Sequence, residues 1–326
     1  MCTALSFTSG DHYFGRNLDL EYSYEECVTV VPRSFPLPFR RKGVLSRHLS
    51  FLGMAYVQEG YPLFYDATNE AGLSMAGLNF TQNAFFEEPR EDGKDNIAPF
   101  EFIPWVLSQC RSLKEAKECL SRLRLVRMAF NEKLPVAPLH WMIDSREGSL
   151  VVESVKDGLK VYENPVGVLT NNPPFPMQLS RLNDYRGLSP ESRPNTFAPS
   201  LPLEEYSRGM GAIGLPGDLS STSRFVRASF VKMNAVCGKD ESSSVSQFFH
   251  LLASVEQQRG CCKLGDGVYE ITVYSSCCNA DRGIYYYRTY DNPSIHAVDL
   301  KAMDLDGKTI STFPIQRNTE IEFDNR

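Results

Sequence analysis

Apolar residues alternate with small or polar residues over the first twenty positions of the chain, and this spacing predicts a β-hairpin. Thr3, Leu5 and Phe7 occupy every second position, Ser9-Gly10 is typical of a turn, and the alternation resumes over residues 12–20. The beginning of the chain is therefore expected to lie against a second strand that is rich in polar residues.

The turn also predicts which residues of this hairpin face one another. A tight turn at Ser9-Gly10 pairs positions whose numbers sum to about 19, with a slip of about two residues allowed. Cys2 is then expected opposite Asn17, with Arg16 and Asp19 close by. The hairpin would gather a thiol, a guanidinium and a carboxylate at one place.

Runs of β-branched and aromatic residues between turn residues predict further strands. The predicted strands are Val28–Val31, Phe51–Val57, Leu73–Leu78, Leu139–Ile143, Leu150–Glu153, Leu159–Tyr162, Val166–Leu169, Tyr269–Ser275, Gly283–Tyr290 and Ser294–Val298. Helical spacing of apolar positions predicts helices over Pro99–Cys110, Ser112–Leu123, Phe175–Tyr185, Arg224–Val236 and Val245–Glu256. Strands occur in consecutive clusters and helices in pairs, an order that favours antiparallel sheets covered by helices over alternating βαβ units.

Local signals refine this organisation. Ser112 and Glu115 form a capping box at the start of the second predicted helix. Residues 186–222 are rich in Pro, Ser and Gly and have little periodicity, which is typical of a long surface excursion that serves as a functional loop or an assembly arm. Because no internal repeat and no interdomain linker is evident, we expect one domain over residues 2–326.

The composition narrows the class of protein. Of the 326 residues, 42% are hydrophobic and 23% are charged, which excludes a globally disordered chain. The formal net charge of −6, without a basic tract, argues against binding to nucleic acid or to an anionic membrane. No apolar run reaches the length of a membrane span, and the first residues lack the basic and apolar regions of a signal peptide.

Cysteine and histidine content bears on the cellular compartment and on metals. The chain has nine cysteines, an odd number without a Cys-x-x-Cys pair, and its five histidines form no zinc-type spacing with them. We therefore expect a reduced, cytoplasmic protein rather than a disulfide scaffold, with no metal site and no cofactor.

Cys2 carries the most informative chemistry in the sequence. Because cysteine is small, the initiator Met1 is expected to be removed, which leaves Cys2 with both a thiol and a free α-amine. An α-amine has an ordinary pKa of about 7.7–8.0, so it can act as a general base beside the nucleophile, and no histidine is needed. On position alone, an inert strand cysteine is the commoner alternative.

Four further polar residues are candidates for supporting this thiol. Arg16 would stabilise the thiolate by Coulomb attraction, and Asp19 would hold the α-amine by a charge-assisted hydrogen bond. Asn79 and Asn171 each follow an apolar strand, where an amide can donate to a developing oxyanion. Taken singly, an Arg/Asp pair is more often a surface ion pair, and an Asn at a strand end is more often a turn residue.

Seven short motifs follow one another along nearly the whole chain. They are Met1-Cys2-Thr3, Phe14-Gly15-Arg16-Asn17-Leu18-Asp19, Ala76-Gly77-Leu78-Asn79-Phe80, Leu139-His140-Trp141-Met142-Ile143, Leu169-Thr170-Asn171-Asn172-Pro173, Gly214-Leu215-Pro216-Gly217-Asp218 and Ser223-Arg224-Phe225-Val226-Arg227. In this order they resemble the choloylglycine hydrolase family, the bile salt hydrolases and penicillin V acylases, which is a branch of the N-terminal-nucleophile hydrolases. Seven ordered motifs are far more specific than any one of them alone.

The resemblance implies an α+β fold, an αββα four-layer sandwich with two antiparallel sheets between helix layers. It also implies hydrolysis of a non-peptide C–N amide bond. Cys2 would be the nucleophile and, through its amine, the base, while Arg16 and Asp19 would order and tune it. Asn79 and Asn171 would build the oxyanion hole, and Arg224 would complete the polar network, although by composition alone its helical pattern indicates a solvated face.

Finer resemblances bear on the substrate. Asn79 and the loop over residues 214–218 resemble the bile salt hydrolase branch, whereas the penicillin acylase branch tends to carry Tyr at the position of Asn79. We therefore expect hydrolysis of glycine- or taurine-conjugated bile acids through an acyl thioester on Cys2, which another amine could also capture. The loop Gly209-Met210-Gly211 resembles family members that favour glycine conjugates.

A steroid substrate needs a broad apolar cleft with few polar anchors. The resemblance implies four lining residues on loops near the nucleophile, Leu18, Tyr24, Phe130 and Leu134. Tyr65 stands where some bile salt hydrolases have a small residue, so it would narrow the pocket. For each of these side chains, packing in the core is the alternative interpretation.

Three alternative functions stay open. An enzyme on the same scaffold could prefer penicillin V or acyl-homoserine lactones. A non-catalytic bile-salt-binding protein would bind bile salts without consuming them and would keep Met1. A structural subunit is supported only by residues 186–222; because the family tends to form tetramers through that region, we expect a homotetramer.

Overall fold

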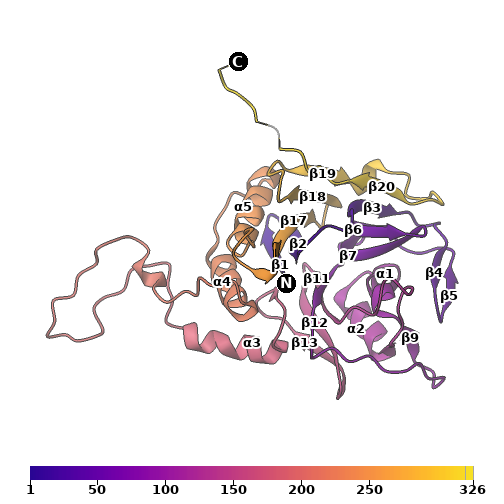
Figure 1. Ribbon diagram of the computed structural model, residues 1–326, viewed down its shortest axis with the longest axis horizontal. Coiled ribbons are helices and arrows are strands. Elements are labelled where there is room, and N and C mark those ends of the chain that lie inside the picture. The colour runs from indigo at the N-terminus through magenta and orange to yellow at the C-terminus, as the bar shows by residue number, and fades with distance from the viewer. Residues whose placement is uncertain (320, 326) are drawn as a thin grey trace.

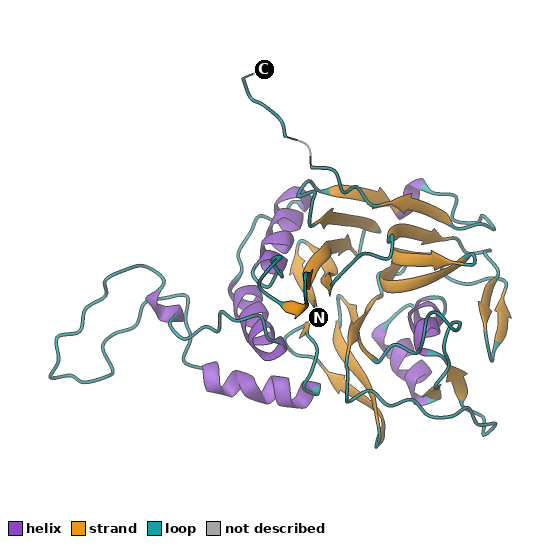
Figure 2. Ribbon diagram, in the orientation of Figure 1, coloured by secondary structure: helices purple, strands orange, loops and turns teal. Residues whose placement is uncertain are grey.

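Two antiparallel β-sheets lie face to face at the centre of the molecule, and helices cover the outer face of each sheet (Figures 1 and 2). The computed structural model describes residues 1–319 and 321–325. Helices α1 (Phe102–Leu107) and α2 (Leu113–Ser121) pack on one sheet, and α4 (Ser221–Asn234) and α5 (Glu241–Ala253) pack on the other, with α3 (Phe175–Arg181) against α4. The predicted αββα four-layer sandwich is confirmed.

The smaller sheet has six strands in the order β14-β1-β2-β17-β18-β19. Its strands are β1 (Cys2–Ser9), β2 (Asp11–Leu20), β14 (Val168–Leu169), β17 (Ile271–Asn279), β18 (Ile284–Thr289) and β19 (His296–Asp299). The larger sheet has eight strands in the order β13-β12-β11-β8-β7-β6-β3-β20. Its strands are β3 (Cys27–Val31), β6 (Phe51–Gln58), β7 (Tyr61–Asn69), β8 (Ser74–Asn79), β11 (Leu139–Ser145), β12 (Gly148–Val155), β13 (Gly158–Glu163) and β20 (Ser311–Pro314).

Short elements complete the chain. Three small two-stranded ribbons are formed by β4 (Leu37–Phe39) with β5 (Gly43–Leu45), β9 (Asp95–Ile97) with β10 (Leu123–Leu125), and β15 (Lys263–Gly265) with β16 (Val268–Tyr269). Single 3-10 turns lie at Pro99–Glu101, Leu182–Tyr185, Met210–Ala212 and Leu300–Ala302.

The apolar core has two parts, one on each face of the larger sheet. One part fills the space between the sheets and continues under α4 and α5, where Phe225 and Phe248 are buried. The other lies between the larger sheet and α1, where Trp141 packs edge-on against Phe102 with ring centroids 4.8 Å apart. Both parts of the core contact the eight-stranded sheet. The expectation of one domain over residues 2–326 stays a prediction.

The N-terminal hairpin forms as expected, and its pairs sum to 20, within the predicted range, but the expected partner of Cys2 is wrong by one residue. Ser9 pairs with Asp11, because Gly10 alone makes the turn with a φ of +68° that suits glycine. Cys2 therefore lies opposite Leu18, not Asn17. Since side chains alternate across a strand, Leu18 shares the face of Cys2, and Asn17 points to the other face.

Helix starts differ from the prediction where a cap lies further upstream than the apolar spacing suggests. Helix α4 begins at Ser221 because Ser220 accepts from the Ser223 backbone, and α5 begins at Glu241 because Asp240 accepts from the Ser243 backbone at 2.9 Å. Ser112 caps α2 as predicted, accepting from the Glu115 backbone at 3.3 Å. The Glu115 carboxylate accepts from the Arg111 backbone instead of closing the predicted capping box.

The segment between α3 and α4 runs away from the body of the molecule (Figure 1). It has the surface exposure that was predicted: Phe197 and Tyr206 are 84% and 83% exposed. The predicted range of 186–222 is two residues too long, because α4 already begins at Ser221. Within residues 1–319 and 321–325, no helix combines the length and the apolar character needed to cross a membrane.

Candidate active site

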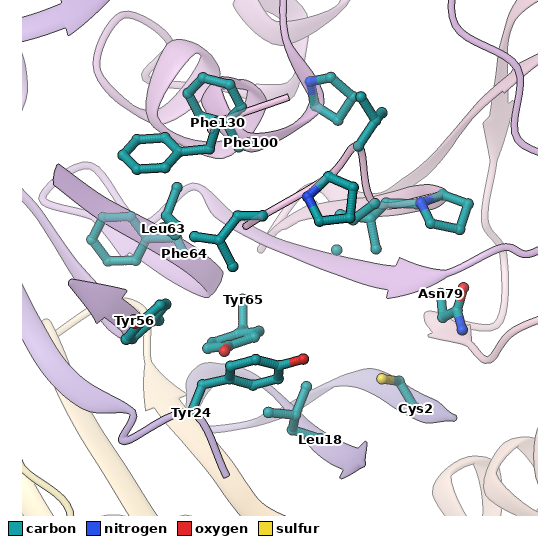
Figure 3. Close-up of a pocket in the computed structure, with 18 of the residues that line it drawn as sticks. Cys2, Leu18, Tyr24, Tyr56, Leu63, Phe64, Tyr65, Asn79, Phe100 and Phe130 are labelled. Atoms are coloured by element: carbon teal, nitrogen blue, oxygen red, sulfur yellow. The ribbon is translucent and has the colours of Figure 1, made fainter. Parts of the chain in front are cut away.

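Cys2 begins β1, an inner strand of the smaller sheet between β14 and β2. Its side chain is only 4% exposed, and it borders a cavity of about 450 Å³. Figure 3 shows the Cys2 sulfur at one end of this cavity, with Leu18 beside it. The thiol therefore faces the cavity from a strand that is paired on both sides.

Arg16 follows on the same face of the hairpin and is fully buried. Its Nη1 donates to the backbone carbonyls of Tyr65 at 2.9 Å and Gly77 at 2.5 Å. Its Nη2 is buried without a hydrogen-bond partner among the described residues. Burial opposes the charged form, but the negative groups around it, Cys2 first, raise the pKa of Arg16. A permanent cation therefore faces the thiol.

Asp19 lies on the opposite face of β2 and is also fully buried. Its Oδ1 accepts from the Thr272 hydroxyl at 2.6 Å, whereas Oδ2 has no hydrogen-bond partner among the described residues and lies 3.9 Å from Arg224 Nη1. Burial raises the pKa of the Asp19 carboxyl, and the Arg224 charge opposes this rise. For Arg224, burial lowers the pKa and Asp19 opposes the fall.

Asn171 joins Cys2, Arg224 and Asn79 in one network. Its Oδ1 accepts from the Cys2 backbone nitrogen and from Arg224 Nη2, both at 2.8 Å. Its Nδ2 donates to the Asn79 carbonyl at 2.8 Å. Arg224 Nη1 in addition donates to the Cys2 carbonyl and the Thr3 hydroxyl, both at 2.6 Å. Four distant parts of the sequence therefore meet at the start of β1.

The chain reaches this network by crossing between sheets. After β13 at the edge of the larger sheet it turns and adds β14 to the smaller sheet, where Leu169 pairs with Ala4. Asn171 follows at once, and the Ser221 hydroxyl at the start of α4 accepts from its backbone nitrogen at 2.9 Å. This crossing therefore places the Asn171 side chain next to Cys2.

Asn79 ends β8 and borders the same cavity as Cys2. Its Oδ1 accepts from the Thr81 hydroxyl at 2.6 Å, which leaves Nδ2 as the end of the amide without an acceptor among the described residues. Figure 3 places the Asn79 amide at the Cys2 end of the cavity. Asn79 and Asn171 thus lie side by side. Asn79 keeps both Nδ2 hydrogens, whereas Asn171, which is not among the residues that line the cavity, keeps one Nδ2 hydrogen that can donate to a ligand oxygen.

Met1 is present, so the Cys2 nitrogen is an amide here and has no basic lone pair. The Met1 ammonium donates to the Asp19 carbonyl at 2.9 Å and forms an ion pair with the buried Glu270. The predicted role of the Cys2 amine concerns the chain after Met1 has been removed. Removal would place a charged or basic nitrogen at the position that already contacts Asn171 Oδ1.

All five predicted lining residues border the cavity. They are Leu18, Tyr24, Tyr65, Phe130 and Leu134. Leu18 lies near the thiol, whereas Phe130 lies at the far end, with the Tyr24 and Tyr65 rings in between (Figure 3). The wall is therefore apolar and aromatic over most of its length.

Several lining residues were not predicted from the sequence. They include Tyr56, Leu63, Phe64, Phe100, Met128 and the stretch 135–139. Leu63 and Phe64 lie on β7, a strand that the sequence analysis missed because Pro62 and Asp66 interrupt its apolar pattern. Among the described residues, no group of three or more His, Cys, Asp and Glu side chains is arranged to hold a metal ion.

The family model for linear amide C–N hydrolases of the choloylglycine hydrolase family matches residues 2–313. The chain belongs to this family. Among curated proteins, it is 52% identical over 320 residues to a bile salt hydrolase/transferase of Lactiplantibacillus plantarum, covering 98% of each chain. It is 37% identical over 329 residues to a bile salt hydrolase/transferase of Clostridium perfringens, covering 100% of each.

Two solved structures agree with the fold. A crystal structure of a variant conjugated bile acid hydrolase from Clostridium perfringens superposes with a TM-score of 0.92 at 36% identity, over 99% of this chain and 100% of that one. A penicillin V acylase from Agrobacterium tumefaciens gives a TM-score of 0.74 at 18% identity, over 97% and 92% of the two chains, and shows a shared fold alone. The family resemblance of the seven sequence motifs is therefore confirmed.

Proposed function

We propose that the chain hydrolyses the C–N amide bond of glycine- or taurine-conjugated bile acids. The observation that carries this proposal is the placement of the Cys2 thiol at the end of an aromatic and apolar cavity of about 450 Å³. Such a cavity suits a rigid apolar acyl group, and the thiol end holds the polar groups that an amide needs. The relatives matched over the full chain carry the names of bile salt hydrolases.

The reaction follows from the groups around Cys2. The thiolate attacks the amide carbonyl carbon, and the carbonyl electron pair moves to the oxygen. As the tetrahedral intermediate collapses, the C–N bond breaks and the Cys2 α-amine passes the thiol proton to the leaving glycine or taurine nitrogen. Water then adds to the carbonyl carbon of the acyl thioester and gives a second tetrahedral intermediate. When this intermediate collapses, the C–S bond breaks, the free bile acid is released and the thiol is regenerated. Another amine in place of water would give acyl transfer.

The polar residues divide the remaining work. The side-chain amides of Asn171 and Asn79 would donate to the oxyanion of the tetrahedral intermediate. Stabilising this oxyanion is where fixed hydrogen-bond donors contribute most to acyl transfer. Arg16 would balance the thiolate charge from its buried position. Asp19, with an unpartnered Oδ2, would hold the α-amine after Met1 removal, and Arg224 would keep Asn171 and the Cys2 backbone in place.

The test is a comparison of amine release from glycocholate, taurocholate and penicillin V by the wild type and by Cys2→Ala. We expect release from the bile conjugates by the wild type alone, with glycine conjugates preferred. Release from penicillin V only would move the activity to the acylase alternative. Bile salt binding without release, by a protein that keeps Met1, would support the non-catalytic alternative and refute the proposal.

We also infer a homotetramer in the cytoplasm. The exposed Phe197 and Tyr206 on the segment that leaves the body support an assembly role for that segment. Light scattering after gel filtration should give a mass near four times 36.8 kDa, and Phe197→Ser with Tyr206→Ser should lower it. A monomeric wild type would contradict the inference. The cytoplasmic location stays a prediction from the cysteine content.

A further inference from the structure

His140 and Glu153 form a buried pair that the proposed reaction does not use. They lie on the neighbouring strands β11 and β12, and they are 0% and 1% exposed. His140 Nδ1 lies 3.2 Å from Glu153 Oε1, which also accepts from the Phe175 backbone nitrogen at the start of α3 at 2.9 Å. Neither side chain borders the cavity. Because the pair is buried and lies outside the cavity, we look for its role in the residues that it contacts.

His140 of this pair contacts the sequence neighbours of both amides of the proposed oxyanion hole. His140 Nε2 contacts the Thr170 carbonyl at 2.8 Å, one residue before Asn171. The His140 ring stacks on Phe80, one residue after Asn79, with centroids 4.3 Å apart and planes 4° apart. One imidazole therefore touches the neighbour of each amide.

The contact with Thr170 fixes the proton on the ring. A carbonyl only accepts, so Nε2 must carry hydrogen and donate. On the other side Nδ1 faces a carboxyl group, so either His140 is a cation beside ionised Glu153, or neutral His140 accepts from protonated Glu153. In both states one proton lies between Nδ1 and the Glu153 carboxyl group, and the pair has no net charge, which suits a site closed to water. The Nε2 donor is present in either case.

No other described donor reaches the Thr170 carbonyl. The N–H end of the same peptide plane, the Asn171 backbone nitrogen, donates to the Ser221 hydroxyl at 2.9 Å. His140 thus holds the carbonyl end of that peptide plane while Ser221 holds its N–H end, and the His140 ring supports Phe80, the residue that follows Asn79.

We propose that His140 is a positioning residue that holds Asn79 and Asn171 in the one geometry in which both amides donate to the same oxyanion. The inference rests on the proposed amide hydrolysis at Cys2. It assigns a role to the Leu139-His140-Trp141-Met142-Ile143 motif, for which the mechanism alone has no use. It also distinguishes two functions of the site, because a thiol reaction that forms no oxyanion does not need the amides as oxyanion donors.

The test compares His140→Phe with His140→Gln. Phenylalanine keeps the stacking on Phe80 and removes the donor, so kcat for a conjugated bile acid should fall about 10–100-fold with KM within about 3-fold, because a small misplacement of oxyanion donors costs that much. Glutamine places an amide nitrogen near the position of Nε2, so His140→Gln should recover at least about a third of the lost rate constant.

A second measurement separates positioning from general damage. Iodoacetamide alkylates a thiolate by displacing iodide and forms no oxyanion, so the alkylation rate of Cys2, followed by peptide mass spectrometry, should stay within about 2-fold in His140→Phe. The matched control is His12→Phe. His12 is another buried histidine paired with a carboxylate, Asp144, at 2.5 Å, but it lies at the turn end of the hairpin. This control should lose stability and keep kcat.

The outcomes are distinct. Unchanged kcat in His140→Phe, a parallel loss of kcat and Cys2 alkylation, or an equal loss of kcat in His12→Phe would each overturn the inference. If His140→Phe does not fold, Phe80→Leu tests the same support from the Asn79 side, and unchanged kcat there would also overturn it. A wild type that releases no amine from bile conjugates would refute the proposed function instead.

Discussion

Replacing Arg224 by Met should cost more stability than any nearby substitution of a comparable arginine. Arg224 is fully buried and donates to the Cys2 carbonyl, the Thr3 hydroxyl, Asn171 Oδ1 and the Leu219 carbonyl. It is also the positive charge 3.9 Å from the buried Asp19 carboxylate. Methionine fills a similar volume but supplies neither donor nor charge, so Asp19 is left without compensation.

The magnitude follows from that uncompensated charge. Removing one partner of a buried ion pair typically costs about 3–5 kcal/mol, more than the loss of neutral hydrogen bonds. Arg227, one turn further along α4, provides a matched control because it donates to the carbonyls of Pro216, Ser254 and Asp218 but faces no buried carboxylate. Arg227→Met should cost about 1–3 kcal/mol, because it loses three hydrogen bonds alone.

Urea denaturation gives the free energies of unfolding of both variants. Adding Asp19→Asn to Arg224→Met removes the buried charge and should recover about 2 kcal/mol, an interaction energy that a double-mutant cycle isolates. Equal losses in Arg224→Met and Arg227→Met, or no recovery in the double variant, would refute the reasoning.

The pH dependence of the free energy of unfolding provides an independent check that the Asp19 charge destabilises Arg224→Met. Burial raises the pKa of Asp19 and Arg224 holds the rise in check, so the pKa should rise further in Arg224→Met. A carboxyl whose pKa is higher in the folded state destabilises that state as the pH rises through the folded pKa. The deficit of Arg224→Met relative to wild type should therefore grow as the pH rises above the ordinary pKa of aspartate, about 3.9, and level off once the carboxyl is ionised in the folded variant.

The amino terminus and Lys232 provide two further tests. A tag fused directly before Cys2 keeps its nitrogen an amide and should lower turnover at least about 100-fold, and cleavage that exposes Cys2 should restore it; amine release above a tenth of wild type from the intact fusion would contradict this. Burial lowers the pKa of Lys232 to about 8, so wild type should gain up to about 3 kcal/mol over Lys232→Met between pH 8 and 10.5. A flat difference in urea midpoints over that range would contradict the second prediction.

The sequence predicts much of the fold because its strongest signals are local. The hairpin, the paired helices and most central strands follow from alternation and spacing over a few residues. The register of the hairpin does not, since one residue in the turn moves every pairing and flips Asn17 to the other face. Strand β7 is missed because Pro62 and Asp66 break an apolar pattern that the larger sheet nevertheless buries.

The site residues also differ in whether local sequence signals predict their place. Cys2, Arg16 and Asp19 are near one another in the sequence, so their proximity is predictable from the hairpin alone. Arg224 sits in a helix whose pattern suggests a solvated face, and only the family motif indicates its burial beside Asp19. The pair of His140 and Glu153 carries no signal of its role, because the role depends on a third chain segment, at Thr170, that meets them only in three dimensions.

The crossing of β14 beside β1 has a consequence for synthesis of the protein. The nucleophile leaves the ribosome almost first, whereas Asn171 and Arg224 follow roughly 10–45 s later at about 5–20 residues per second. Until then the thiol lacks the Asn171 donor and the Arg224 guanidinium that bonds to its backbone. A nascent chain, or one truncated before α4, should therefore be inert toward amides even though it carries its nucleophile, so that reactivity appears only after synthesis has passed Arg224, about two-thirds of the way along the 326 residues.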